Sequence, residues 1–165
     1  LDEYLSVPPF VNKKIINDQG WQIVLLNSKS DTPKGLVTQS DLLALASMVD
    51  EEKYQLLMMH HHPLDVGYFM DKHGLENQTQ FWQTINKFSC IKGITCGHVH
   101  QSLTLYSEST PSIPLFTCPA TSIQFDTTKS SGASNGQGAG YRIFSLFADG
   151  KINSDSYFLS REVNV

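Results

Sequence analysis

The sequence of 165 residues predicts an α/β protein in which a parallel βαβαβ unit is followed by antiparallel strands. Apolar runs of strand length alternate with helix-like segments as far as His100, and short strand candidates separated by turn residues come after it. A content of 40% hydrophobic and 17% charged residues is ordinary for a globular protein, and the length fits one domain.

Three apolar runs have the composition of strands that are buried on both faces, at residues 21–26, 54–59 and 90–96. Between them, residues 38–51 and 77–88 place apolar side chains at helical spacing, and Thr38 or Ser40 can cap the first helix. This order favours parallel strands joined by right-handed crossovers. Sites in such sheets lie beyond the carboxyl ends of the strands.

After His100 the pattern changes to short strands. The candidates are residues 102–106, 114–118, 122–125, 141–147 and 151–159. Asp149-Gly150 is typical of a hairpin turn. Residues 129–140 are rich in glycine and serine and predict a flexible loop or a plain linker. We therefore expect an antiparallel tail on the parallel unit.

Five of the six histidines lie in two segments that directly follow predicted strands, at residues 59–64 (MHHHPL) and 96–101 (CGHVHQ). Imidazole is a common ligand of zinc, iron and manganese. If the second segment continues as a strand, His98 and His100 point to the same side. A site with nitrogen ligands from two strand ends is therefore favoured over histidines that merely fill core or surface positions.

The sequence offers few other ligands near these histidines. Three histidines can hold one zinc ion and leave a position for water, whereas a two-metal site requires a bridging anionic oxygen. Asp65 and Asp71 are the nearest acids, and Asp65 is either a partner that fixes an imidazole tautomer or a solvated loop acid. Cys96 is a conceivable ligand, but a small core residue is the more common role.

Composition excludes several classes of protein. The net charge of −4 provides no basic field for nucleic acid, and no apolar stretch approaches the length of a membrane span. The three cysteines form no CxxC motif, which favours a reducing, cytoplasmic location. P-loop and dinucleotide-binding motifs are absent from the sequence. The first residue is leucine, and we expect residues to precede it.

Six pieces of sequence carry a resemblance to a known family. They are WQIVLLNS (21–28), MHHHPL (59–64), DKHGLEN (71–77), CGHVHQ (96–101), CPATSIQF (118–125), and GYR (140–142) followed by Asp149-Gly150. In this order they resemble the C-terminal part of a calcineurin-like metallophosphoesterase, closest to the bacterial class III 3′,5′-cyclic-AMP phosphodiesterases. The resemblance implies a four-layer α/β/β/α sandwich and two metal ions (iron, manganese or zinc) that bind a bridging hydroxide.

The resemblance also implies roles for individual residues. The implied metal ligands are His61, His98 and His100. The implied substrate-side residues are His62, His73 and Asn77. His61 and His98 would share one ion and His100 would serve the other, while His60 would be packing at a strand end.

The family's Asp-x-His, Gly-Asp and Gly-Asn-His motifs lie N-terminal to these pieces. Gly-Asn-His and Gly-Asp do not occur in the 165 residues, and the one Asp-x-His, at 71–73, belongs to the DKHGLEN piece. In the family the N-terminal motifs supply the bridging aspartate, the remaining ligands and a catalytic histidine. Smaller departures are Asn27, where relatives usually carry aspartate, and PATS at 119–122, where they usually read Pro-Ser-Thr.

We therefore expect residues 1–165 to be the C-terminal portion of one metallophosphoesterase domain whose parent protein hydrolyses a cyclic nucleotide, with cyclic AMP as the first candidate. The fragment alone would be inactive and hold metal weakly. Alternatives are a natural truncation that acts as a binding or regulatory module, a phosphoesterase for another phosphodiester, and a self-sufficient tri-histidine zinc hydrolase. Strands at 21–26 and 54–59 that are apolar on both faces also predict self-association.

Overall fold

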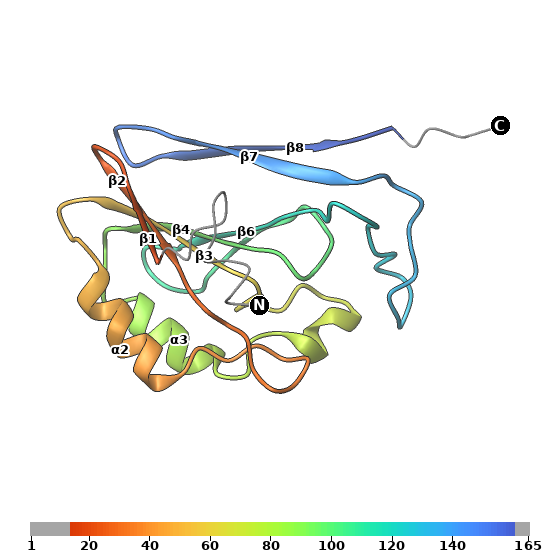
Figure 1. The fold of residues 1–165 in the computed structure, drawn as a ribbon, viewed down its shortest axis with the longest axis horizontal. Helices are drawn as coiled ribbons and strands as arrows, with labels where there is room; N and C mark the ends of the chain where they lie inside the picture. The colour runs from red at the N-terminus through yellow and green to blue at the C-terminus, as the bar shows by residue number, and fades with distance from the viewer. Residues whose placement is uncertain (1–13, 161–165) are drawn as a thin grey trace, which may run out of the picture.

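The computed structural model describes residues 14–160, which form three layers (Figure 1). In chain order the elements are β1 (Ile15–Asn17), β2 (Trp21–Leu25), α2 (Gln39–Met48), β3 (Tyr54–Met59), the 3-10 helix η1 (Phe69–His73), α3 (Gln78–Ile85), β4 (Ile91–Cys96), β5 (Thr104–Tyr106), β6 (Pro114–Thr117), β7 (Gly140–Leu146) and β8 (Ile152–Phe158). Helices α2 and α3 cover one face of a six-stranded sheet, and the β7–β8 hairpin covers the other. Within residues 14–160, no helix is long and apolar enough to cross a membrane.

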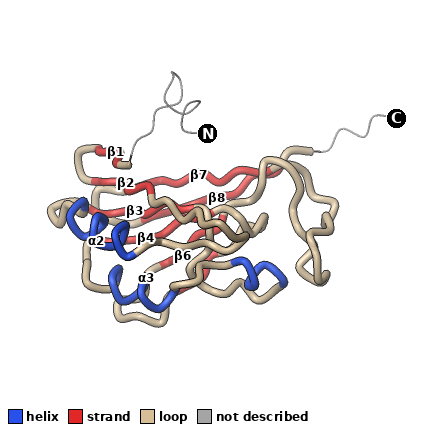
Figure 2. The backbone as a smooth tube through the Cα atoms, turned by 60° about the horizontal axis from the view of Figure 1, so that its bottom comes forward, coloured by secondary structure: helices blue, strands red, loops and turns tan. Residues whose placement is uncertain are grey.

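The six-stranded sheet has the order β1-β2-β3-β4-β6-β5 (Figure 2). Strands β2, β3, β4 and β6 are parallel, and the short edge strands β1 and β5 are antiparallel to their neighbours. The parallel βαβαβ unit is thus confirmed. The assignment of residues 114–118 to an antiparallel tail was wrong, because Ile94 pairs with Leu115 and β6 extends the parallel part.

The core lies between the sheet and the two helices. One row of register partners crosses four strands, namely Val24, Leu57, Ile94 and Leu115, and each of these side chains is completely buried. Leu45 of α2 and Phe81 and Ile85 of α3 belong to the same core. Burial of each such side chain stabilises the fold by about 1.5–3 kcal/mol.

Both predicted helices are present but shorter than expected. Thr38 caps α2, and its hydroxyl oxygen accepts a hydrogen bond from the Asp41 N–H at 3.1 Å. The helix ends early because the backbone of Val49 is already extended. The expected strand at 122–125 is only an isolated bridge between Phe125 and Ser134.

The physical reason for the missing strand is the fully buried Gln124. Its amide oxygen accepts from the Ala120 N–H at 2.9 Å, and its amide nitrogen donates to the carbonyls of Ala120 and Gly138 at 2.7 and 3.0 Å. A side chain thus satisfies backbone groups that a neighbouring strand would otherwise pair.

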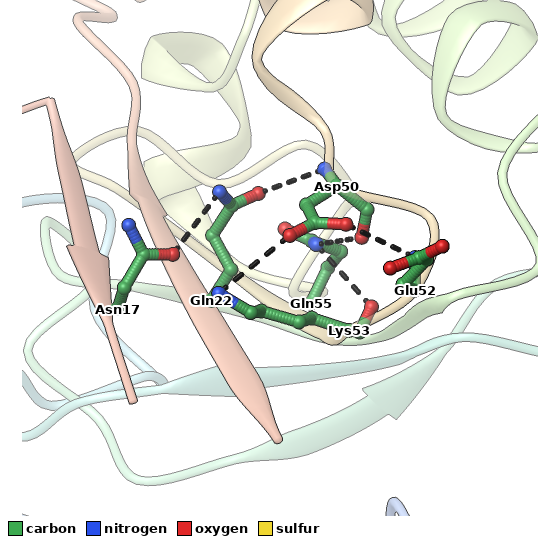
Figure 3. A network of polar contacts seen from close by, with 6 residues as sticks. All are labelled: Asn17, Gln22, Asp50, Glu52, Lys53 and Gln55. Atoms are coloured by element: carbon green, nitrogen blue, oxygen red, sulfur yellow. Dashed lines mark hydrogen bonds and ion pairs between the residues drawn. The ribbon is translucent and has the colours of Figure 1, made fainter. Parts of the chain in front are cut away.

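Two buried glutamines close the end of the sheet opposite to the histidines (Figure 3). Gln22 and Gln55 are register partners on β2 and β3. The Gln22 side-chain oxygen accepts from the Asp50 N–H at 3.1 Å, and the Gln55 amide donates to the Asp50 carbonyl at 2.7 Å. These bonds fix the turn between α2 and β3 and give each buried glutamine a hydrogen-bond partner toward the amino ends of the two strands.

Arg142 fastens the hairpin to the sheet. Its guanidinium donates to the carbonyls of Leu103 and Thr117 at 2.6 and 2.9 Å and to the Ser154 hydroxyl at 2.8 Å, and it lies 5.0 Å from the centre of the Phe116 ring. The guanidinium makes five hydrogen bonds in all. They can form together only when the hairpin lies in this position on the sheet.

The second sheet contains only the β7–β8 hairpin, and among residues 14–160 no helix covers its outer face (Figure 1). Tyr141, Ile143 and Tyr157 point outward with 46, 51 and 47% of their surface exposed. The expectation that β2 and β3 leave a large apolar surface uncovered is met only in part. The hairpin covers that face of the sheet (Figure 1), although Met58 of β3 is 37% exposed, and several exposed apolar side chains lie on the hairpin itself.

We expect Arg142→Ala to lower the free energy of unfolding by about 2 kcal/mol, because two backbone carbonyls would lose a charged donor. Urea denaturation followed by circular dichroism measures the change. The matched control is Lys151→Ala, whose ammonium contacts only the exposed Asp149 at 2.9 Å and should have no measurable effect. Equal stability of the two variants would contradict the role given to Arg142.

Candidate metal centre

The two histidine segments leave the sheet at the same edge. Strands β3 and β4 are parallel and in register, with Met59 beside Cys96 at their carboxyl ends. The rings of His60 and His61 consequently lie 4.8 and 4.6 Å from the ring of His98. One nitrogen from each of these three histidines lies within 4.8 Å of the others. We call His60, His61 and His98 the histidine group.

The geometry of the histidine group fits one metal ion. His98 Nδ1 is 3.1 Å from His60 Nε2. Two imidazole nitrogens bound to the same zinc, each about 2.0–2.1 Å from it, are separated by about 3–3.4 Å. His98 Nε2 is buried and has no hydrogen-bond partner among the described residues. His60, which the resemblance places as packing, is therefore a candidate ligand.

The segment that carries His98 and His100 is a loop and not a strand, because β4 ends at Cys96. Both histidines have left-handed backbones, with φ of 69° and 51°. Such conformations cost about 1–3 kcal/mol each and are concentrated at functional sites. The expectation that strand alternation would place the two rings on one side was therefore wrong.

The two rings accordingly have different surroundings. The His98 ring lies beside the rings of His60 and His61. The His100 ring instead stacks on Phe125, with ring centres 4.1 Å apart and an angle of 6° between the planes. The Nδ1 of His100 lies 2.8 Å from the Ile123 carbonyl. If Nδ1 carries the proton and donates there, Nε2 is left free as a ligand atom, but His100 is not part of the histidine group.

Ser28 orients His61. The buried Ser28 hydroxyl lies 2.9 Å from His61 Nδ1, and its oxygen accepts from the His61 backbone N–H at 3.2 Å. Gly35 packs against the same ring, and a Cβ at that position would come within 2.4 Å of His61 atoms. Serine and glycine thus fix the imidazole and leave Nε2 for a ligand role. Ser28 ends the WQIVLLNS piece that carries the resemblance, whereas no sequence pattern indicated a role for Gly35.

The environment keeps these imidazoles neutral at pH 7. Burial, followed by the neighbouring histidines, lowers the pKa of His61 to about 4 and that of His98 to about 3. Burial, followed by His100, also lowers the pKa of His60. Neutral imidazole is the form that binds metal ions.

His62 is completely buried and does not reach the surface. Its Nε2 lies 3.6 Å from Asp71 Oδ1, and Asp71 accepts from the backbone N–H groups of Val66 and Gly67 at 2.7 and 2.9 Å. Burial lowers the pKa of His62, and the charge of Asp71 opposes that effect. Asp71 is therefore the acid that lies beside His62. A contact between His62 and a substrate would require the loop at residues 65–71 to move.

The other expected site residues have different partners. The backbone of His73 lies near His98 and offsets part of the decrease in its pKa. The Asn77 amide is bonded to both the N–H and the carbonyl of Val37, so it joins the start of α3 to the segment before α2. Asp65 is an exposed loop acid that accepts from Gln78 at 3.3 Å. Cys96 packs in the core.

No protein-family model matches the chain. Curated relatives do match. A probable cyclic nucleotide phosphodiesterase of Colwellia psychrerythraea is 52% identical over 163 residues, which cover 96% of this chain and 62% of the relative. The 3′,5′-cyclic adenosine monophosphate phosphodiesterases CpdA of Vibrio vulnificus and Escherichia coli K12 are 35 and 31% identical and are covered over 49 and 54% of their length. The chain thus spans between about half and three fifths of these relatives.

We expect Ser28→Ala to weaken zinc binding about 10–100-fold, because the hydroxyl that orients the His61 ring through Nδ1 would be lost. Calorimetric titration of the metal-free chain with zinc measures this affinity. Ser47→Ala is the matched control, since Ser47 bonds only to the Ala44 carbonyl on the exposed side of α2. The same affinity in both variants would show that Ser28 does not support a metal ligand.

Proposed function

We propose that the chain is the C-terminal portion of a dinuclear-metal phosphodiesterase domain of the metallophosphoesterase family, because a relative named as a probable cyclic nucleotide phosphodiesterase is 52% identical to it over 163 residues. The proposed reaction is hydrolysis of 3′,5′-cyclic nucleotides, with cyclic AMP as the first candidate. The observation that carries the proposal is the histidine group at the carboxyl edge of β3 and β4 in a chain 52% identical to a probable cyclic nucleotide phosphodiesterase.

Neutral imidazoles at this edge fit a metal ion. His61 and His98 would hold one ion together with His60, and Nε2 of His100 would serve a second. When bound, iron, manganese or zinc would polarise the phosphate and supply a hydroxide at neutral pH. Ser28 and the Ile123 carbonyl hold the imidazoles of His61 and His100 in place.

Three free cysteines support the further proposal of a reducing, cytoplasmic location.

The described residues leave the proposed site without a bridging anion. Among residues 14–160, no carboxylate joins the histidine group, and Asp71 is directed at His62. Two adjacent cations need an anionic oxygen between them. We therefore propose that the missing ligands come from a part of the domain that corresponds to the unmatched portion of the relatives.

We expect no cyclic AMP hydrolysis by the purified chain with manganese, iron or zinc, because the ligand set is incomplete. Addition of the portion of the Colwellia psychrerythraea relative that lies outside the match should restore turnover, and His98→Ala should abolish it again. Phosphate release measures the rate. Chelator-sensitive turnover by the chain alone would refute its incompleteness, and a folded but inactive mixture of the two parts would refute the proposed reaction.

A non-catalytic binding module is the second candidate, and the exposed outer face of the hairpin favours it. Tyr141 and Tyr157 are cross-strand partners whose rings stack with centres 5.4 Å apart, and Ile143 lies beside them on the same face. A two-stranded sheet also has two unpaired edges. On this basis we propose that the isolated chain is a homo-oligomer that covers the hairpin.

We expect sedimentation velocity at micromolar concentration to show a dimer or larger species. The double variant Ile143→Ser and Tyr157→Ser should shift it toward monomer, because the apolar side chains that drive association would be lost. Tyr106→Ser is the matched control, since Tyr106 is 66% exposed on β5, an edge strand of the six-stranded sheet. A monomer before any substitution, or an equal shift with the control, would refute association through the hairpin.

A further inference from the structure

Two phenylalanine rings lie directly beside the proposed metal site. Phe69 is the first residue of η1, and Phe125 follows the loop after β6. Their ring centres are 5.3 Å apart at an angle of 57°. Both side chains are only partly buried. We call Phe69 and Phe125 the aromatic shelf.

The aromatic shelf is fastened to the loop that carries the histidines. Phe125 stacks on the His100 ring, and its backbone N–H donates to the His100 carbonyl at 3.3 Å. The Tyr68 hydroxyl, next to Phe69 in sequence, donates to the carbonyl of Val99. His100 therefore holds Phe125 directly, and Phe69 packs against Phe125 beside a tyrosine that is bonded to Val99. A molecule bound at the histidines would find the shelf close to it.

A surface lysine lies over the Phe69 ring of the aromatic shelf. The ammonium of Lys72 lies 5.6 Å from the centre of the Phe69 ring, and Lys72 is exposed. A lysine side chain on the surface moves readily, so a flat ring can take its place or lie beneath it. The ammonium would remain close by, where it complements an anionic ligand.

We propose that the aromatic shelf is the stacking surface for the base of the nucleotide, with Phe69 as the residue that favours phosphodiesters carrying a planar aromatic ring. The inference rests on the proposed function, because the histidine group would hold the phosphate. Stacking on phenylalanine tolerates any base, since every base has a π-face. The shelf therefore selects nucleotides over glycerol-type phosphodiesters without distinguishing adenine from guanine.

The test compares three probes on the zinc-loaded chain by ligand-observed NMR. They are cyclic AMP, ribose 3′,5′-cyclic phosphate, which lacks the base, and adenosine, which lacks the phosphate. Phe69→Leu keeps an apolar side chain but removes the π-face, and Phe69→Trp restores one. Tyr106→Leu, on the edge strand β5, is the matched control for loss of an exposed aromatic ring.

We expect Phe69→Leu to lower the affinity for cyclic AMP and for adenosine about tenfold, a typical loss for one stacked base. The affinity for ribose cyclic phosphate should not change. Phe69→Trp should recover the affinity, and zinc binding and the melting temperature should not change. Equal binding of cyclic AMP and the baseless phosphate by the unaltered chain, or an equal loss with Tyr106→Leu, would overturn the shelf alone.

The proposed function fails separately. If neither cyclic phosphate binds the zinc-loaded chain, the assignment of a phosphodiester site at the histidine group is overturned. Adenosine binding that still depends on Phe69 would then uphold the shelf as a base-binding surface. If adenosine also fails to bind, both the shelf and the phosphodiester site are overturned.

Discussion

The parallel register between β3 and β4 is the constraint on which the rest of the site depends. It places Met59 beside Cys96, so the segments that follow both strands emerge at one edge of the sheet. The completely buried pair Leu57 and Ile94 holds that register from within the core. A shift by one residue would turn these side chains to the opposite face and separate His61 from His98.

The same edge combines features that oppose stability with features that suit a ligand. Four histidines, His60, His61, His62 and His98, lie close together, and burial depresses the pKa of His61 and His98. The backbones of His98 and His100 are left-handed. Neutral imidazoles avoid mutual repulsion and keep their lone pairs. The rigid sheet tolerates this arrangement because the core beneath it supplies far more stabilisation than the loop costs.

The two faces of the molecule are unequal. The face toward α2 and α3 is closed by a continuous core, whereas the hairpin on the other face is held by Arg142 and by contacts such as Trp21 with Phe147, and its outer side is open. Under the proposed function, the open hairpin and the histidines without a bridging carboxylate have one explanation. A part of the domain that corresponds to the unmatched portion of the relatives would complete both.

The sequence by itself determined the local features of this protein. Apolar runs and helical spacing predicted β2, β3, β4, α2 and α3 to within a few residues, and two histidine segments after strands predicted the site. Periodicity reports only the neighbours of a residue along the chain. The membership of His60, the Ser28 contact with His61 and the different surroundings of His98 and His100 arise between distant segments, 33 positions apart for the serine contact. Only the tertiary structure could decide them.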